Sequence, residues 1–162
     1  MFILETIKHT PTWVIILFFS LLYLGFMQSK DREVSIQRVL ILPIVMIILS
    51  LTGIISAFGI YVSNLSIWII CTAIATIITK KILPSKNISY EESQKTFLIQ
   101  GSWIPMIFIL ITFFVKYTVG YMIATNSQMI SEPSVIYLVC IIYGIISGIF
   151  LARTLAILKA KA

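Results

Sequence analysis

The sequence predicts an all-α membrane protein, a bundle of five transmembrane helices. Hydrophobic residues make up 59% of the 162-residue chain and charged residues only 11%. A soluble domain of this size would therefore carry more apolar surface than it could bury. The apolar residues also gather in long runs, and a bilayer core of ~30 Å needs about 20 helical residues for each crossing. We conclude that lipid is the solvent for most of the chain.

Five apolar runs are long enough, or nearly so, to cross a bilayer. Proline suits the first turn of a helix, where its missing N–H costs little, and Pro11 and Pro133 each open such a run. The acidic Glu5 precedes the first run and no small-residue cleavage site follows it, which indicates a retained helix instead of a removed signal peptide. The expected spans are residues 11–28, 36–58, 63–79, 102–124 and 133–158.

The basic residues predict how these spans are oriented. Three flank the first loop, four lie in the third loop and three close the chain, all on one side of the membrane. Lys8 is alone on the other side, and Lys116 lies inside the fourth span. The positive-inside rule then places the N-terminus outside and the C-terminus in the cytoplasm. Because the positive charge is explained by orientation, we expect no nucleic-acid partner.

The longest loop, residues 80–101, predicts a short cytoplasmic β-hairpin between the third and fourth helices. Ile88 and Tyr90, and then Phe97 and Ile99, alternate with polar or less apolar residues around a polar turn at residues 91–94. A lone hairpin is marginal in water, so its apolar face should rest on the bundle or on headgroups. An amphipathic surface turn is the alternative. The whole chain, 1–162, is then one integral membrane domain.

Small residues recur every four positions in the fifth span and predict a close helix contact. A helix face without bulky side chains lets a neighbouring backbone approach closely. This face can pack inside the monomer or against a second copy, so a homo-oligomer stays open. The residues of this small-residue stripe are Gly144, Gly148, Ala152 and Ala156.

Lys116 is a charge inside a span, and no acidic residue lies in any of the five spans to neutralise it. An ionisable group at this depth costs from ~2.5 to more than 10 kcal/mol, depending on its access to water or a partner. Thr112 and Gly120 share its helix face at four-residue spacing, with Tyr117 and Tyr121 nearby. Three interpretations stay open: a structural lysine, a cation in a small-walled cleft that binds an anion, or a neutral lysine that acts as a base or nucleophile.

Catalytic and metal-binding patterns are missing from the sequence. It contains no Gly-x-Ser-x-Gly or His-Glu-x-x-His motif and a single histidine, and Cys71 and Cys140 form no Cys-x-x-Cys pair. We expect two free thiols, no catalytic residues, no metal and no cofactor. The leading hypothesis is a binding or accessory membrane protein that recognises an anionic lipid or small solute near Lys116. A small transporter or channel subunit is the alternative, and an enzyme ranks third.

Short motifs across nearly the whole chain resemble a family of small bacterial inner-membrane proteins of unknown function. They are the His-Thr-Pro-x-Trp run at 9–13, the Gly-Ser-Trp-x-Pro run at 101–105, and segments 38–43, 116–120 and 143–153. The resemblance implies a multi-pass protein of the bacterial inner membrane, with the lipid bilayer as its partner. It implies no activity, substrate or cofactor.

Overall fold

The computed structural model describes residues 12–82, 88–91, 96–125 and 127–159. These residues form five α-helices, three β-strands and a short 3-10 helix, η1. Helices α3, α4, α5 and α6 are long and apolar enough to cross a membrane, whereas the apolar α2 has 17 residues. The bounds are α2 Thr12–Gln28, β1 Arg32–Ser35, α3 Ile36–Phe58, α4 Val62–Ile82, β2 Ile88–Glu91, β3 Thr96–Ile99, α5 Ile104–Ala124, η1 Gln128–Ser131 and α6 Pro133–Lys159.

The predicted spans agree closely with these helices, and α3 begins and ends at the predicted residues. Helix α4 is longer than predicted, because it continues past Thr79 through two lysines to Ile82. Lysines in a last turn interact favourably with the helix dipole, and their stems reach along apolar surface to water. Helix α5 begins at Ile104 instead of residue 102, with Pro105 in its first turn. The expected start of the first helix, Pro11, lies outside the described residues.

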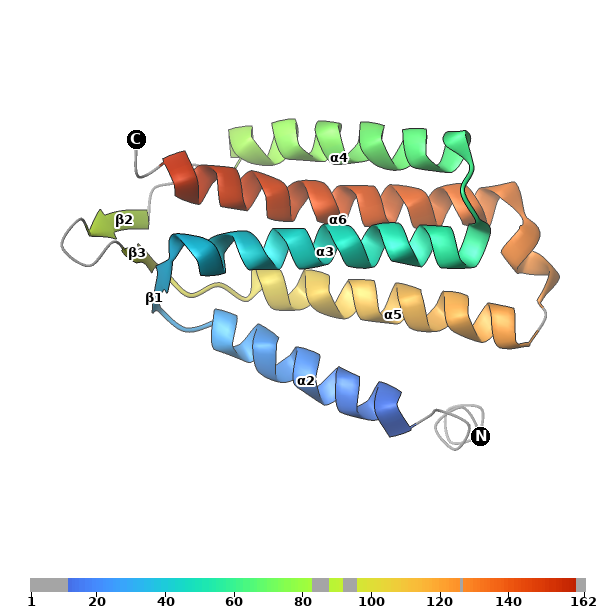
Figure 1. The fold of residues 1–162 in the computed structure, drawn as a ribbon, viewed down its shortest axis with the longest axis horizontal. Helices are drawn as coiled ribbons and strands as arrows, with labels where there is room; N and C mark the ends of the chain where they lie inside the picture. Colours follow the sequence, from blue (N-terminus) through green and yellow to red (C-terminus); the bar gives the residue numbers. More distant parts are fainter. Residues whose placement is uncertain (1–11, 83–87, 92–95, 126, 160–162) are drawn as a thin grey trace.

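The five helices lie side by side in an order that differs from their order along the chain (Figure 1). Helix α6 packs between α4 and α3, α5 contacts α3 and α6, and α2 packs on α5. Successive helices alternate in direction, so α2, α4 and α6 finish at the end of the bundle where α3 and α5 begin. The strands β1, β2 and β3 lie at that end, which we call the strand end.

Helices α4 and α6 run parallel and touch through glycine residues. A Cβ atom added to Gly144 would lie 2.7 Å from the Cβ atom of Cys71, and one added to Gly148 would lie 2.5 Å from the carbonyl oxygen of Thr72. Real Cβ atoms essentially never approach other atoms so closely. The Thr76 hydroxyl also donates to the carbonyl oxygen of Gly148, at 3.2 Å across this contact. Glycine therefore sets the distance between the two helices.

The predicted hairpin forms, and a third strand that we did not predict joins it. Strands β2 and β3 pair antiparallel with Tyr90 opposite Phe97. Strand β1 pairs antiparallel with the other edge of β3, which gives the order β1-β3-β2. The only hydrophobic residue of β1 is Val34, too short a pattern to indicate a strand. Residues 92–94 of the predicted turn lie outside the described residues.

A small apolar core joins the sheet to the helices. Val34 of β1 is buried together with Phe97 and Ile99 of β3, Val39 of α3 and Ile157 of α6. The apolar face of the sheet thus rests on the bundle, as the marginal stability of a lone hairpin requires. This contact brings β1, the first turns of α3 and the last turns of α6 to one place.

Candidate functional site

A cavity of about 470 Å³ opens at the strand end, where α2, β1, α3, β3 and α6 meet. Its volume is in the range of pockets that hold small molecules, ~300–1,000 Å³. We call it the basic cavity, because four basic and two acidic side chains line it above an apolar floor. Its lining residues are Lys30, Arg32, Arg38, Arg153, Asp31, Glu33, Gln28, Thr154, Met27, Val34, Val39, Leu42, Ile99, Phe150 and Ile157.

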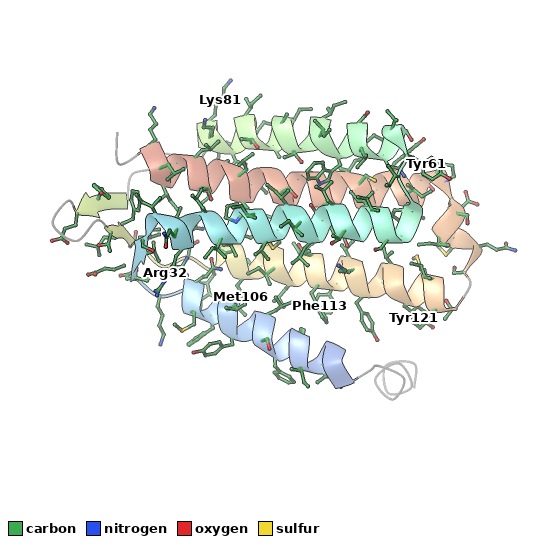
Figure 2. All side chains as sticks on the ribbon, in the orientation of Figure 1. Arg32, Tyr61, Lys81, Met106, Phe113 and Tyr121 are labelled. Carbon is green, nitrogen blue, oxygen red and sulfur yellow. The ribbon has the colours of Figure 1, made fainter. Side chains whose placement is uncertain are left out.

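Strand β1 places Arg32 in the wall of the basic cavity. Side chains alternate along a strand, so Arg32 shares a face with the buried Val34, opposite Ile99 of β3. Burial lowers the pKa of the Arg32 guanidinium, because loss of solvent disfavours its charged form. Its Nη2 atom donates to Oε1 of the buried Gln28 at 3.4 Å. Figure 2 shows Arg32 at the strand end of the bundle.

Arg153 reaches the same cavity from α6. It lies six residues before the helix ends at Lys159, which is ~9 Å along the axis, and it is partly buried. Its charge is repelled by that of Arg32. Among the described residues, neither arginine has a carboxylate within 4.0 Å. Two partly buried cations that repel each other and form no ion pair lower the stability of a fold.

Thr154, the next residue of α6, adds a hydroxyl to the wall of the basic cavity. It is only 5% exposed, and its hydroxyl has no hydrogen-bond partner within the part of the chain that the structure describes. The wall of the basic cavity therefore contains a neutral hydroxyl donor as well as two guanidinium groups that form no ion pair with the described residues.

Two hydrogen bonds hold the loop between α2 and β1 in place. The Gly101 N–H donates to Oδ1 of Asp31 at 2.6 Å, and the Ser102 N–H donates to the carbonyl oxygen of Gln28 at 3.1 Å. Only glycine fits at position 101, since an added Cβ atom would lie 2.6 Å from the carbonyl carbon of Ser29. These bonds fix the loop that leads into Arg32 and engage the Asp31 carboxylate with backbone.

Positive charge exceeds negative charge in the basic cavity, with four cations against two carboxylates. Glu33 is exposed, since it points to the opposite face of β1 from Arg32. Arg38 in the first turns of α3 and Lys30 are also exposed and form the rim. Guanidinium groups bind carboxylate and phosphate oxygens through paired N–H donors. The arrangement is therefore suited to hold an anion, with the Arg32 and Arg153 guanidiniums as its inner ligands.

The residues predicted around Lys116 lie elsewhere, on α5. Lys116 and Gly120 are exposed, and a Cβ atom added to Gly120 meets nothing within 4 Å. Thr112 is buried, and its hydroxyl donates to the carbonyl oxygen of Phe108 at 2.8 Å. The side of Lys116 on which Gly120 was expected to form the wall of a cleft therefore faces open space.

The two tyrosines near Lys116 point to different surroundings. The Tyr117 ring stacks on Phe113, with ring centroids 6.2 Å apart. Tyr121 is 49% exposed and lies at the opposite end of α5 from Met106 (Figure 2). An anion site around Lys116 stays a prediction, and the basic cavity is a second candidate that the structure adds.

The small-residue stripe of α6 faces inward for most of its length. Gly144, Gly148 and Ala152 are buried and Ala156 is partly buried. Because α4 already covers the two glycines, a second copy of the chain could use this face only by displacing α4. Cys71 and Cys140 are both free thiols. The described residues contain no group of three or more His, Cys, Asp or Glu side chains able to hold a metal.

The basic cavity was not predicted, because Arg32 and Arg153 were interpreted only as charges that orient the membrane spans. Arg153 carried a usable signal, since it lies inside an apolar helix that also contains no acidic residue. The same rule that drew attention to Lys116 applies to it. The partner, Arg32, lies more than a hundred residues earlier in the chain, and no local pattern connects the two.

The whole chain, residues 1–162, matches a family of unknown function (DUF6622), and the protein belongs to that family. No curated protein and no solved structure matches it. The family membership brings no activity with it, so a function has to be argued from the site.

Proposed function

We propose that this member of a family of unknown function is a multi-pass membrane protein that binds a phosphate-bearing anion in the basic cavity. The observation that carries the proposal is the convergence of Arg32 and Arg153 on one cavity without an acidic partner among the described residues. Such a pair destabilises the empty protein, whereas a bound anion turns the repulsion into two attractive contacts. Arrangements that cost stability are typical of sites kept for binding.

Charge and chemistry favour phosphate over a single carboxylate. The lining of the basic cavity has two more cations than carboxylates. A phosphate monoester carries about −1.5 to −2 charges at pH 7 and three acceptor oxygens, which matches this excess, whereas a carboxylate carries one charge. The Arg32 and Arg153 guanidiniums supply paired N–H donors, and the Thr154 hydroxyl supplies a further donor.

The proposed setting is the bacterial inner membrane, with the strand end in the cytoplasm. Four helices of the described chain are long and apolar enough to cross a bilayer. Lys30, Arg32, Arg38, Arg153 and Lys159 gather at the strand end, as basic residues do on the cytoplasmic side. A cavity on this side would meet both phosphorylated solutes and anionic lipid headgroups.

A transporter or channel subunit is the alternative, and the interior of the bundle does not favour it. Ser50 and Ser147 hydrogen-bond to each other at 2.9 Å between α3 and α6. Ile54, Cys140 and Tyr143 are buried in one apolar cluster nearby. A permeation path would need polar groups lining an aqueous route, whereas these side chains fill the space between the helices.

Thermal unfolding of the purified protein in detergent tests the proposal. The melting temperature is measured in inorganic phosphate and in chloride at equal ionic strength. Phosphate at 100 times its Kd should stabilise the protein by ~2.7 kcal/mol. Arg153→Met should raise the melting temperature in chloride, because one of two repelling charges is removed, and should abolish the phosphate-dependent shift.

Lys159→Met is the matched control, since it removes an exposed positive charge from the last turn of the same helix. This variant should keep the phosphate-dependent shift. A wild-type protein that phosphate does not stabilise, or an Arg153→Met variant that phosphate still stabilises, would contradict the proposal. An Arg153→Met variant that melts earlier in chloride would indicate a structural role for the arginine instead.

A further inference from the structure

We infer that the phosphate group belongs to an amphiphile of the surrounding leaflet, which enters the basic cavity sideways between the end of α2 and the beginning of α3. This inference rests on the proposed function, because it identifies the class of ligand for the same cavity. The chemistry shared by all candidate ligands is a phosphate monoester. What distinguishes the amphiphile from a soluble phosphate compound is an apolar portion that reaches lipid.

The basic cavity has more room, and more apolar wall, than a phosphate group uses. Its volume of about 470 Å³ is that of a site for a whole small molecule, whereas phosphate has only five heavy atoms. Leu42 and Phe150 line the cavity and also pack in the core cluster that contains Met46 and Ile146. Apolar walls left in water weaken the fold, so a ligand that covers them gains binding free energy.

Apolar side chains near the basic cavity are exposed on both α2 and α3. Helix α2 packs mainly on α5 and hardly touches α3 (Figure 1). Met27, which lines the cavity from α2, is 48% exposed, and Ile41 on α3 is 56% exposed. In a bilayer, exposed apolar side chains of this kind contact acyl chains. An acyl chain can therefore leave the cavity into lipid without crossing a polar barrier.

The basic cavity also lies at the height of the lipid headgroups. Helix α2 ends at Gln28 and α3 begins at Ile36, and the cavity lies between these two helix ends. Trp103 at the same end is 56% exposed and packs edge-on against Phe26, with ring centroids 6.3 Å apart. Exposed tryptophans are enriched at the membrane–water interface. A headgroup phosphate at this height meets Arg32 while its acyl chains remain in the bilayer.

Two ligands with the same phosphate monoester test this inference: dioctanoyl phosphatidic acid and glycerol 3-phosphate. Thermal unfolding of the full chain in detergent is followed as each is titrated. Dioctanoyl phosphatidic acid should reach half of its maximal shift at a concentration at least tenfold lower than glycerol 3-phosphate. Burial of about two methylene groups is enough for a tenfold difference. Dioctanoylglycerol, which has the chains but no phosphate, should give no shift.

Met27→Gln separates chain binding in the cavity from simple partitioning into detergent. It should weaken the response to dioctanoyl phosphatidic acid at least threefold and leave the response to glycerol 3-phosphate unchanged, because only the acyl chain passes Met27. Ile69→Gln on α4, where Ile69 is 57% exposed, is the matched control and should change neither response.

The possible results separate this inference from the proposed function. Equal apparent affinities for the two phosphate ligands, or an unchanged preference in Met27→Gln, would contradict the amphiphile inference while the phosphate site itself stands. Stabilisation by neither ligand would overturn both.

Discussion

Replacing Gly148 by alanine tests the closest helix contact of the fold. The added Cβ atom would lie 2.5 Å from the carbonyl oxygen of Thr72 and 2.7 Å from the Cβ atom of Ala75 on α4. Because carbon atoms in contact lie ~3.5–4.0 Å apart, α4 has to withdraw from α6 by roughly 0.5–1 Å. This shift loosens the packing along the interface and stretches the 3.2 Å hydrogen bond from Thr76 to Gly148.

The expected loss of stability in Gly148→Ala can be estimated from the energies of these contacts. Overpacking of a tight contact costs about 1–3 kcal/mol, and loss of an interhelical hydrogen bond in a membrane protein adds ~0.6 kcal/mol. Alanine gains up to about 1 kcal/mol over glycine in helix propensity. Gly120→Ala has the same gain in helix propensity, but its added Cβ atom contacts nothing within 4 Å. The Gly148→Ala variant should therefore be less stable than Gly120→Ala by roughly 2–3 kcal/mol.

Reversible unfolding in mixed detergent and dodecyl sulfate micelles, followed by tryptophan fluorescence, measures this difference. Gly148→Leu, with a larger side chain, should be destabilised further. If Gly148→Ala and Gly120→Ala unfold at the same dodecyl sulfate fraction, α4 does not lie against Gly148 and the packing described for α6 is wrong. A change in oligomeric mass instead of stability would place a second copy of the chain at this face.

Three further predictions concern the loop, the topology and the thiols. Gly101→Ala should lower both the melting temperature and the phosphate affinity, because it displaces the loop that Asp31 anchors before Arg32. A variant with the melting temperature and phosphate Kd of the wild-type protein would contradict this role of the loop. Reporter fusions after residue 86 and at the C-terminus should read cytoplasmic, and one near residue 128 periplasmic, whereas a periplasmic C-terminus would reverse the orientation. Cys140, which is fully buried, should react slowly with a water-soluble maleimide; a Cys71–Cys140 disulfide on a diagonal gel of fresh membranes would contradict two free thiols.

The helices could be predicted because four of them are apolar runs long enough to cross a bilayer, and the fifth is a shorter apolar run. Helix α3 has the predicted bounds, since Ser35 and Gly59 flank a long, mostly apolar run. The hairpin could be predicted because its two strands are adjacent in the sequence. Strand β1 could not, because Arg32–Ser35 gains its partners from β3, more than sixty residues away. A local sequence pattern carries no information about the pairing of strands that lie far apart in the chain.

The faces of the helices could not be predicted, and the site depends on them. A helix that is apolar all round gives no amphipathic signal to show which side is buried. Thr112 and Gly120 share a spacing with Lys116, yet the structure buries Thr112 and leaves Gly120 open. Arg32 and Arg153 line one cavity because β1 pairs with β3 and both strands pack on Ile157 of α6. Their convergence is a product of tertiary contacts alone.

Calorimetric titration of inorganic phosphate into Arg153→Met and Lys116→Met decides most directly where this protein binds an anion. Each substitution removes one positive charge from a helix long enough to span the membrane, but only Arg153 lines the basic cavity. The Kd of Lys116→Met should stay within twofold of the wild-type value, and that of Arg153→Met should rise at least tenfold, since a hydrogen bond to a charged group contributes ~1.5–3 kcal/mol. The reverse pattern, with phosphate binding lost in Lys116→Met and kept in Arg153→Met, would place the site on α5 and contradict the basic cavity.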